Sequence, residues 1–382
     1  MPAPIQQMQQ LRQDLAAQFP ERREVIEGTL YALLSSESIL LLGPPGTGKS
    51  SLARAVAQAF GARYFERLLT KFTTPEEIFG PVSLKALEND RYTRVTTDRL
   101  PEAEIAVIDE TFKANSAILN SLLTLMNERL FHNDDGQPTP CPLVTLFGAS
   151  NELPEGNELE ALFDRFLLRY ELSYLLRPSN LRAILTAPDP TSPASMTMDN
   201  LRAAQAEVLT IAITDETLDA LLAIREACKA EGIVASDRRW KKCLKAARAS
   251  AYLAGESKTS PEDLSLLTDC LWREPKERPK LARLVGKLAD PVGSQALEIL
   301  DAARETSARV SALQTGDRRS YISAAANALE EFNAQQAKLA DLGKSAARRS
   351  KQSITDATSE ILQLHTELAR IVATGLRIGG AR

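Results

Sequence analysis

"LLLGPPGTGKS", residues 40–50, decides the fold of this chain. The apolar run at 38–42 predicts a buried strand, and "SSLARAVAQAF" (50–60) predicts the helix that follows it. Between them lies the pattern G-x-x-x-x-G-K-S, whose glycines allow backbone N–H groups to turn inward around an anion at a helix N-terminus. We therefore predict that a nucleotide polyphosphate binds at Gly43, Pro44, Pro45, Gly46, Thr47, Gly48, Lys49, Ser50 and Ser51.

Two further stretches supply side chains for phosphoryl-transfer chemistry. Lys49 is expected to reach the β and γ phosphates, and the Ser50 hydroxyl to bind Mg²⁺. A second apolar run, 105–108, ends in Asp109 and Glu110. Hydrolysis needs one acidic group near the metal and one that orients or deprotonates water. We assign Mg²⁺ binding to Asp109 and water activation to Glu110, so that ATP and Mg²⁺ are the predicted cofactors.

The pattern of apolar residues divides the chain into three predicted domains. Residues 1–175 carry apolar runs at 38–42, 105–108, 143–148 and 166–170 with helix-like stretches between them, which predicts an α/β core with a largely parallel sheet. Residues 176–275 lack a strand run and contain four helical patterns, which predicts an all-α lid domain.

Residues 276–382 are alanine-rich and show three heptad seams, which predicts a three-helix bundle or a coiled-coil hairpin arm with breaks near Gly316 and Gly343. The seams are Ala296, Ile299, Ala303, Thr306, Val310 and Leu313; Ile322, Ala325, Leu329, Phe332, Gln336 and Leu339; and Ile354, Ala357, Ile361, Leu364, Leu368 and Ile371.

Composition excludes several classes of protein. With 382 residues, 44% apolar residues and a net charge of −4, the chain resembles an ordinary globular protein without a bulk nucleic-acid or membrane surface. No apolar run approaches the ~18 residues of a membrane span, and the polar N-terminus lacks a signal core. Four widely spaced cysteines favour a reducing cytoplasm, and two histidines make a histidine-based metal site improbable.

Three more motifs make the chain resemble an AAA+ ATPase. "TLFGASNELP" (145–154) places Asn151 at a strand end, where the resemblance implies a sensor-1 residue that touches the γ-phosphate and the attacking water. "LFDRF" (162–166) resembles an arginine-finger motif, so Arg165 is expected to act in trans on a neighbouring subunit's nucleotide; a surface ion pair with Asp164 is the alternative. "SDRRWKK" (236–242) places Arg238 at the sensor-2 position, with Arg239 as the alternative and the choice between cis and trans left open.

Within that superfamily the chain resembles the RavA-type MoxR ATPases over about residues 20–275. The resemblance rests on "TKFTTPEEIFGPVSLKAL" (70–87), on residues 92–131, and on "ASNELPE", "SDRRWKK" and "DCLW". It implies a five-stranded core, a helical lid and a ring, usually of six subunits. It also implies chaperone-like work on protein clients, with a partner that carries a von Willebrand factor A (vWA) domain. The C-terminal segment departs from the pattern, because RavA-type proteins carry a small β-rich domain there.

The resemblance also suggests weaker sites. Glu21 and Arg22 are expected to wall the adenine. Lys113 and Arg129 are expected to face a subunit interface, where either could contact nucleotide or the neighbouring subunit. "RLFHNDDGQPTPCPL" (129–143) predicts a hairpin with Asp135-Gly136 at its tip, which in this branch lines the ring pore, with His132 as a polar loop residue. "TTPEEIFGPVSL" (73–84) fits a second loop insertion that moves with nucleotide state.

Three functional hypotheses follow. The first is Mg²⁺-dependent ATP hydrolysis in a ring that remodels protein partners. The second is a nucleotide-switched scaffold that binds a partner through the C-terminal helices. The third, a nucleic-acid motor, is disfavoured because the predicted hairpin carries Asp134 and Asp135 and no basic residue beyond Arg129.

Overall fold

The computed structural model describes residues 3–133, 138–186, 196–314 and 318–379. They form two compact units. One comprises residues 1–218 and 229–278, and the other comprises residues 219–228 and 279–382. The hairpin tip at Asp135-Gly136, most of the loop at 186–197 and Gly316 lie outside the described residues.

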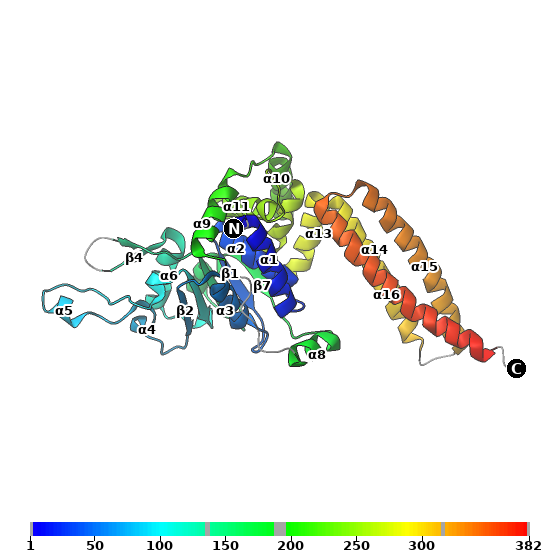
Figure 1. Ribbon diagram of the computed structural model, residues 1–382, viewed down its shortest axis with the longest axis horizontal. Coiled ribbons are helices and arrows are strands. Elements are labelled where there is room, and N and C mark those ends of the chain that lie inside the picture. The colour runs from blue at the N-terminus through cyan, green and yellow to red at the C-terminus, as the bar shows by residue number, and fades with distance from the viewer. Residues whose placement is uncertain (1–2, 134–137, 187–195, 315–317, 380–382) are drawn as a thin grey trace. The chain divides into compact units, whose positions relative to one another are not determined.

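A five-stranded parallel sheet forms the centre of the first unit, in the order β2-β3-β6-β1-β7 (Figure 1). Its central strands β6 and β1 are buried along their whole length. The strands are β1 (Ser38–Leu42), β2 (Tyr64–Leu68), β3 (Ile105–Asp109), β6 (Thr145–Ser150) and β7 (Phe166–Glu171). This sheet, with an all-α lid and an all-α C-terminal extension, confirms the predicted fold class.

The described part of the first 163 residues also contains seven α-helices and two 3₁₀ turns. They are α1 (Pro4–Gln18), α2 (Arg23–Ser35), α3 (Lys49–Phe60), α4 (Pro75–Phe79), α5 (Leu84–Leu87), α6 (Ser116–Glu128) and α7 (Asn157–Phe163), with 3₁₀ turns at Leu100–Glu102 and Thr111–Lys113. The predicted hairpin is present as β4 (Leu130–His132) and β5 (Pro138–Pro140), which pair antiparallel, and His132 is exposed on it.

The edge strand β2 and the helix α1 were not predicted from the sequence. The edge strand β2 was missed because only Phe65 of its five residues is buried, so the strand lacks an apolar run. The helix α1 lies in a glutamine-rich stretch, where Met8, Leu11 and Leu15 form a narrow buried stripe at helical spacing.

The lid consists of helices, as predicted. They are α8 (Pro178–Thr186), α9 (Met198–Thr210), α10 (Asp215–Ala230), α11 (Asp237–Leu253), a 3₁₀ helix (Pro261–Leu267) and α12 (Thr268–Leu271), followed by a 3₁₀ turn (Pro275–Glu277). The sequence analysis did not predict α9, although Thr197 caps its N-terminus and its apolar residues Met198, Leu201 and Val208 are buried.

The second unit has its own core. After α13 (Arg278–Ala289), the helices α14 (Pro291–Ala312), α15 (Arg318–Ser345) and α16 (Arg348–Gly379) pack against one another. Most of the predicted seam residues are buried there, with Phe332 fully enclosed, whereas Leu313 follows the end of α14 and is exposed. No helix within the described ranges is long and apolar enough to cross a membrane.

A glycine in α2 permits close packing of this helix on the sheet. A Cβ atom at Gly28 would lie 2.0 Å from the hydroxyl oxygen of Tyr170 on β7, which is buried. We predict that Gly28→Ala lowers the free energy of unfolding by about 1–3 kcal/mol through overpacking. Gly343→Ala is the matched control, because no atom lies within 4 Å of its Cβ position in α15; it should stabilise by about 0.5–1 kcal/mol. Denaturant unfolding checks both, and an unchanged Gly28→Ala variant would contradict the packing.

Candidate active site

The phosphate loop connects the carboxyl end of β1 to α3. Gly43 approaches the next strand so closely that a Cβ would lie 2.1 Å from the Leu172 carbonyl oxygen. Gly46 and Gly48 have φ of +80° and +87°, and no atom lies within 4 Å of their Cβ positions. Left-handed glycines in front of a helix N-terminus turn backbone N–H groups inward, and the space beside them is open. The loop therefore fits a polyphosphate.

Lys49 occupies the centre of this loop and is buried. Its ammonium group donates hydrogen bonds to the carbonyl oxygens of Gly43 and Pro44 and, at 3.0 Å, to Asn151 Oδ1. Burial lowers the pKa of Lys49, and the carboxylates of Asp109 and Glu110 oppose this shift.

Asn151 joins Lys49 to the acidic pair. Strand pairing aligns Asp109 of β3 with Ala149 of β6, and Leu42 of β1 with Ser150, so these strands end together. Asn151 Nδ2 donates to Glu110 Oε1 at 2.8 Å, and Lys113 Nζ lies 3.2 Å from Glu110 Oε2. The structure therefore brings together four of the predicted side chains in the order Lys49, Asn151, Glu110, Lys113.

Glu110 is held in an uncommon backbone conformation. Its φ of 52° lies in the left-handed region, which non-glycine residues rarely adopt and which costs free energy. The Glu110 amide donates to Asp109 Oδ1 at 2.9 Å, which supports this turn. The carboxylates of Asp109 and Glu110 are both close enough to Lys49 to favour its charged form.

The residues present fit a magnesium ion that arrives with nucleotide. No cluster of three or more histidine, cysteine or acidic side chains that could hold a metal occurs in the described ranges. Mg²⁺ typically uses one or two protein ligands together with phosphate oxygens and water. Ser50 in the first turn of α3 and Asp109 at the end of β3 are side chains of this type, and Ser51 is exposed beside them.

Arg165 lies at the opposite end of the strands from the phosphate loop. Phe166, directly after Arg165, pairs with Ser38 at the start of β1, whereas the phosphate loop follows Leu42 at its end. Four steps of parallel strand at about 3.3 Å each separate these ends by about 13 Å. Arg165 is therefore distant from the phosphate loop of its own chain along the strand direction.

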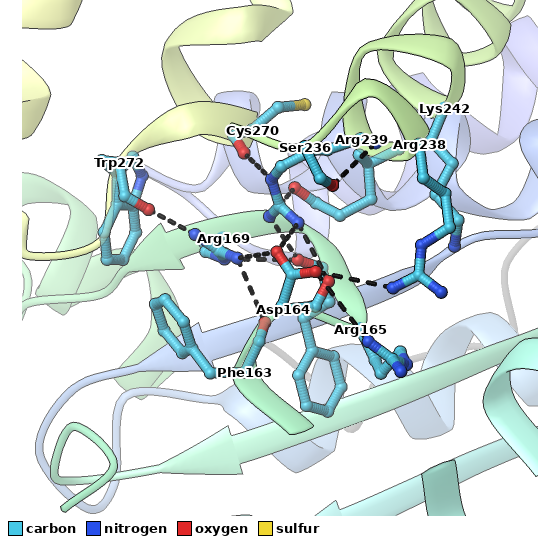
Figure 2. Close-up of polar contacts among 12 residues, drawn as sticks. Phe163, Asp164, Arg165, Arg169, Ser236, Arg238, Arg239, Lys242, Cys270 and Trp272 are labelled. Atoms are coloured by element: carbon cyan, nitrogen blue, oxygen red, sulfur yellow. Dashed lines mark hydrogen bonds and ion pairs between the residues drawn. The ribbon is translucent and has the colours of Figure 1, made fainter. Parts of the chain in front are cut away.

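Figure 2 shows Asp164 among the arginines of this edge. Arg165 Nη1 lies 3.9 Å and Arg238 Nη2 lies 3.5 Å from Asp164 Oδ2, so the ion pair expected as the alternative for Arg165 is present. The neighbours Phe163 and Phe166 are buried, as expected for core anchors. Burial and the nearby Arg238 lower the pKa of Arg165.

Arg239, the alternative sensor-2 residue, is used inside its own chain. Its side chain is 4% exposed and donates to the carbonyl oxygens of Cys270 at 2.7 Å and Phe166 at 2.8 Å. Arg238 is 48% exposed, which leaves it as the better candidate for contact with a ligand.

Glu21 and Arg22 form hydrogen bonds with the segment between β7 and α8. The Glu21 carboxylate accepts hydrogen bonds from the amides of Leu176 and Arg177 at 2.8 and 3.0 Å, which helps to lower its pKa, and Arg22 donates to the Ser173 carbonyl. Direct contact with adenine stays a prediction. The sequence analysis missed Tyr174 on this connection, whose hydroxyl donates to the Pro45 carbonyl of the phosphate loop at 3.3 Å. The sequence signal that could have indicated this contact is an aromatic residue shortly after β7.

Lys113 and Arg129, both predicted to face a subunit interface, have different environments in the structure. Lys113 is partly exposed next to Glu110. The Arg129 guanidinium is buried and donates to the carbonyls of Ser36 at 2.8 Å and Val144 at 3.2 Å. This use within the chain does not fit the expected role at a subunit interface.

Two projecting segments are joined to each other. The segment 70–95, which contains α4 and α5, and the β4–β5 hairpin extend from the sheet on the same side (Figure 1). Asn133 accepts from the Arg94 amide at 2.7 Å and donates to the Arg94 carbonyl at 3.2 Å. The rings of Phe79 and Phe131 stack with centroids 5.6 Å apart. The two predicted loop insertions therefore contact each other.

The strand order, the phosphate loop on a central strand and the helical lid after the sheet define an AAA+ ATPase. Comparison with known families narrows this class. Residues 6–212 match the model of the MoxR domain of MoxR–vWA–beta-propeller ternary systems, and residues 216–285 match an AAA lid domain. The chain belongs to the MoxR family of AAA+ ATPases.

Individual proteins are also similar to the chain in sequence. Two uncharacterized proteins of Methanocaldococcus jannaschii are similar to the chain. One is 43% identical over 293 residues, covering 76% of this chain and 78% of the relative. The other is 39% identical over 296 residues, covering 77% of each. The ATPase subunit HslU of an ATP-dependent protease of Staphylococcus aureus is 25% identical over 130 residues, covering 34% of this chain and 26% of HslU.

A solved structure shares the fold. It is the crystal structure of a candidate ATPase of Cytophaga hutchinsonii, which aligns with a TM-score of 0.59 at 16% identity and covers 72% of this chain and 90% of that one.

Proposed function

We propose that the protein hydrolyses ATP at a site shared between neighbouring subunits of a ring, and that it uses this cycle to remodel protein partners. The observation that carries the proposal is the separation of the two halves of the site. The phosphate loop, Glu110 and Asn151 lie at the carboxyl edge of the sheet, and Arg165 and Arg238 lie at the amino end of β7. A second copy of the chain is needed to bring such halves together.

The residues at the carboxyl edge have the chemistry for hydrolysis. Lys49 would exchange its carbonyl partners for phosphate oxygens, which are stronger acceptors. Asn151 already contacts both Lys49 and Glu110, so its amide is placed to orient a water molecule that Glu110 deprotonates. Mg²⁺, when bound by Ser50 and Asp109, would neutralise charge on the transferred phosphoryl group.

The arginines would complete this site from the adjacent subunit. Phosphoryl transfer gains from a cation that offsets charge on the equatorial oxygens, and an arginine supplied in trans can contribute ~10³–10⁵ in rate. Arg165 and Arg238 form a basic corner at the amino end of β7. Contact between the basic corner of one subunit and the phosphate loop of the next is a head-to-tail interface, which gives a ring when the rotation between subunits closes. A hexameric ring is the arrangement we propose, and turnover should then depend on protein concentration.

Partners and compartment are proposed on separate grounds. The matching family model describes MoxR domains in ternary systems with vWA and beta-propeller components, so we propose a vWA protein as partner. The α5 segment and the β4–β5 hairpin would face the ring pore and protein clients, where Leu84 is 77% exposed. The four cysteines are buried, which fits a cytoplasmic location.

Mixing two inactive variants tests the shared site. Lys49→Ala removes phosphate binding and Arg165→Ala removes the trans arginine, so each variant alone should lose about 10²-fold or more in kcat. In a 1:1 mixture about a quarter of the interfaces combine an intact phosphate loop with an intact arginine, and turnover should recover to about that fraction. Arg54→Ala, at an exposed arginine paired with Glu66, is the control and should keep full activity. An inactive mixture would contradict a trans arginine.

A trapped state tests the partner proposal. Glu110→Gln should bind ATP and hydrolyse it slowly, since the amide cannot accept a proton. Tagged Glu110→Gln purified with ATP from the native host should therefore retain a vWA protein or a small set of clients, identified by mass spectrometry. Lys49→Ala prepared in the same way is the control for non-specific capture. Enrichment of nucleic acid with replication or repair proteins would favour the motor hypothesis instead.

A further inference from the structure

One carboxylate at the amino end of β7 is surrounded by four guanidinium groups (Figure 2). Asp164 directly follows α7, and its carboxylate lies within 4 Å of arginines from two distant segments. The distances from its carboxylate are 3.9 Å to Arg165, 3.9 Å to Arg169, 3.5 Å to Arg238 and 3.2 Å to Arg239.

The two oxygens of this carboxylate face different pairs. Asp164 Oδ1 faces Arg169 and Arg239, whose side chains are 2% and 4% exposed. Asp164 Oδ2 faces Arg165 and Arg238, whose side chains are 19% and 48% exposed. One oxygen therefore serves a buried pair and the other serves a pair at the surface.

The buried pair fixes Asp164. Arg239 donates to the Cys270 and Phe166 carbonyls and, at 3.0 Å, to the carbonyl of Asp164 itself. Arg169 donates to the Phe163 and Trp272 carbonyls, and its guanidinium lies 3.9 Å from the centroid of the Phe163 ring. Because these donors are satisfied by backbone atoms, the inner oxygen of Asp164 has a rigid position.

The surface pair depends on the outer oxygen. In the described part of the chain, the structure gives Arg165 and Arg238 no ion pair other than the one with Asp164, and Arg165 Nε is buried without a hydrogen-bond partner. Two guanidinium groups side by side repel each other unless a negative charge lies between them. Arg165 precedes β7, whereas Arg238 is in the lid helix α11. The two residues are far apart in the sequence, so the local backbone does not keep them adjacent.

We propose that Asp164 is a positioning residue that holds Arg165 and Arg238 together as a two-guanidinium receptor for the neighbouring subunit's polyphosphate. This inference rests on the proposed trans site. One carboxylate cannot neutralise four guanidinium groups, so the corner keeps an excess of positive charge for an incoming anion. A phosphate can displace the surface pair from Oδ2 while the buried pair retains Oδ1. Arg238 then acts in trans with Arg165, on the same nucleotide.

Asp164→Asn is the variant that separates the two pairs. The amide oxygen can still accept from Arg239, whereas the amide nitrogen, a donor, would face the surface arginines and no longer bridge them. We expect kcat to fall by about ten- to a hundredfold, the range for small errors in position, with the KM for ATP changed less than about threefold. Asp164→Glu, which keeps the charge, should recover part of kcat. Asp199→Asn, at an acid that is 89% exposed, should retain full turnover.

Mixing distinguishes positioning from folding. If Asp164 acts through the arginines, Asp164→Asn mixed 1:1 with Lys49→Ala should recover about a quarter of wild-type turnover, as Arg165→Ala does. If the mixture of Arg165→Ala with Lys49→Ala recovers turnover and the mixture of Asp164→Asn with Lys49→Ala does not, the role of Asp164 is overturned and the proposed trans site remains valid. If neither mixture recovers, the proposed trans site fails as well. An unchanged kcat in Asp164→Asn would also overturn the inference.

A second measurement does not alter Asp164 and remains valid if that variant fails to fold. Two arginines that act as one unit should show non-additive losses, so Arg165→Ala combined with Arg238→Ala should be about as slow as the slower single variant. Losses in kcat that multiply would show independent arginines and overturn the inference.

Discussion

Parallel pairing of the strands is the constraint on which the rest of this structure depends. The carboxyl ends of all strands in a parallel sheet lie on the same side, so the residues that follow β1, β3 and β6 meet there. Lys49, Glu110 and Asn151 consequently form a connected group, although they lie far apart in the sequence. The same constraint places the residues that precede β7 at the other edge. The residues that we propose as the two halves of a phosphoryl-transfer site therefore lie at opposite ends of the strands in one chain, which is the physical reason for proposing a ring.

The buried arginines at the amino end of β7 join the sheet to the lid. Burying a guanidinium is costly, and burial lowers the pKa of Arg169 well below its ordinary value. Backbone carbonyls and the Asp164 carboxylate offset that cost for Arg169 and Arg239. The sheet and most of the lid accordingly belong to one compact unit.

The sequence predicted those parts of the fold and site that depend on local patterns. The phosphate loop needs glycines at fixed offsets, so Gly43–Ser50 could be recognised from the order of its residues. The three heptad seams likewise predicted the C-terminal helices. The edge strand β2 has one buried residue and therefore no apolar run, and α9 was passed over although its buried residues follow helical spacing. Adjacent arginines cannot be told apart by sequence, because the rotation of α11 decides that Arg239 is buried and Arg238 exposed. The contacts of Asp164 likewise depend on tertiary packing of α11 against β7.

The most direct test of the shared site is the structure of the assembled Glu110→Gln protein with ATP and Mg²⁺, determined by electron cryomicroscopy. We predict that Arg165 and Arg238 of one subunit both contact the phosphates held by Lys49 of the next, with Asp164 still bound to Arg239. A nucleotide contacted only by residues of its own subunit, with both surface arginines turned to solvent, would contradict it.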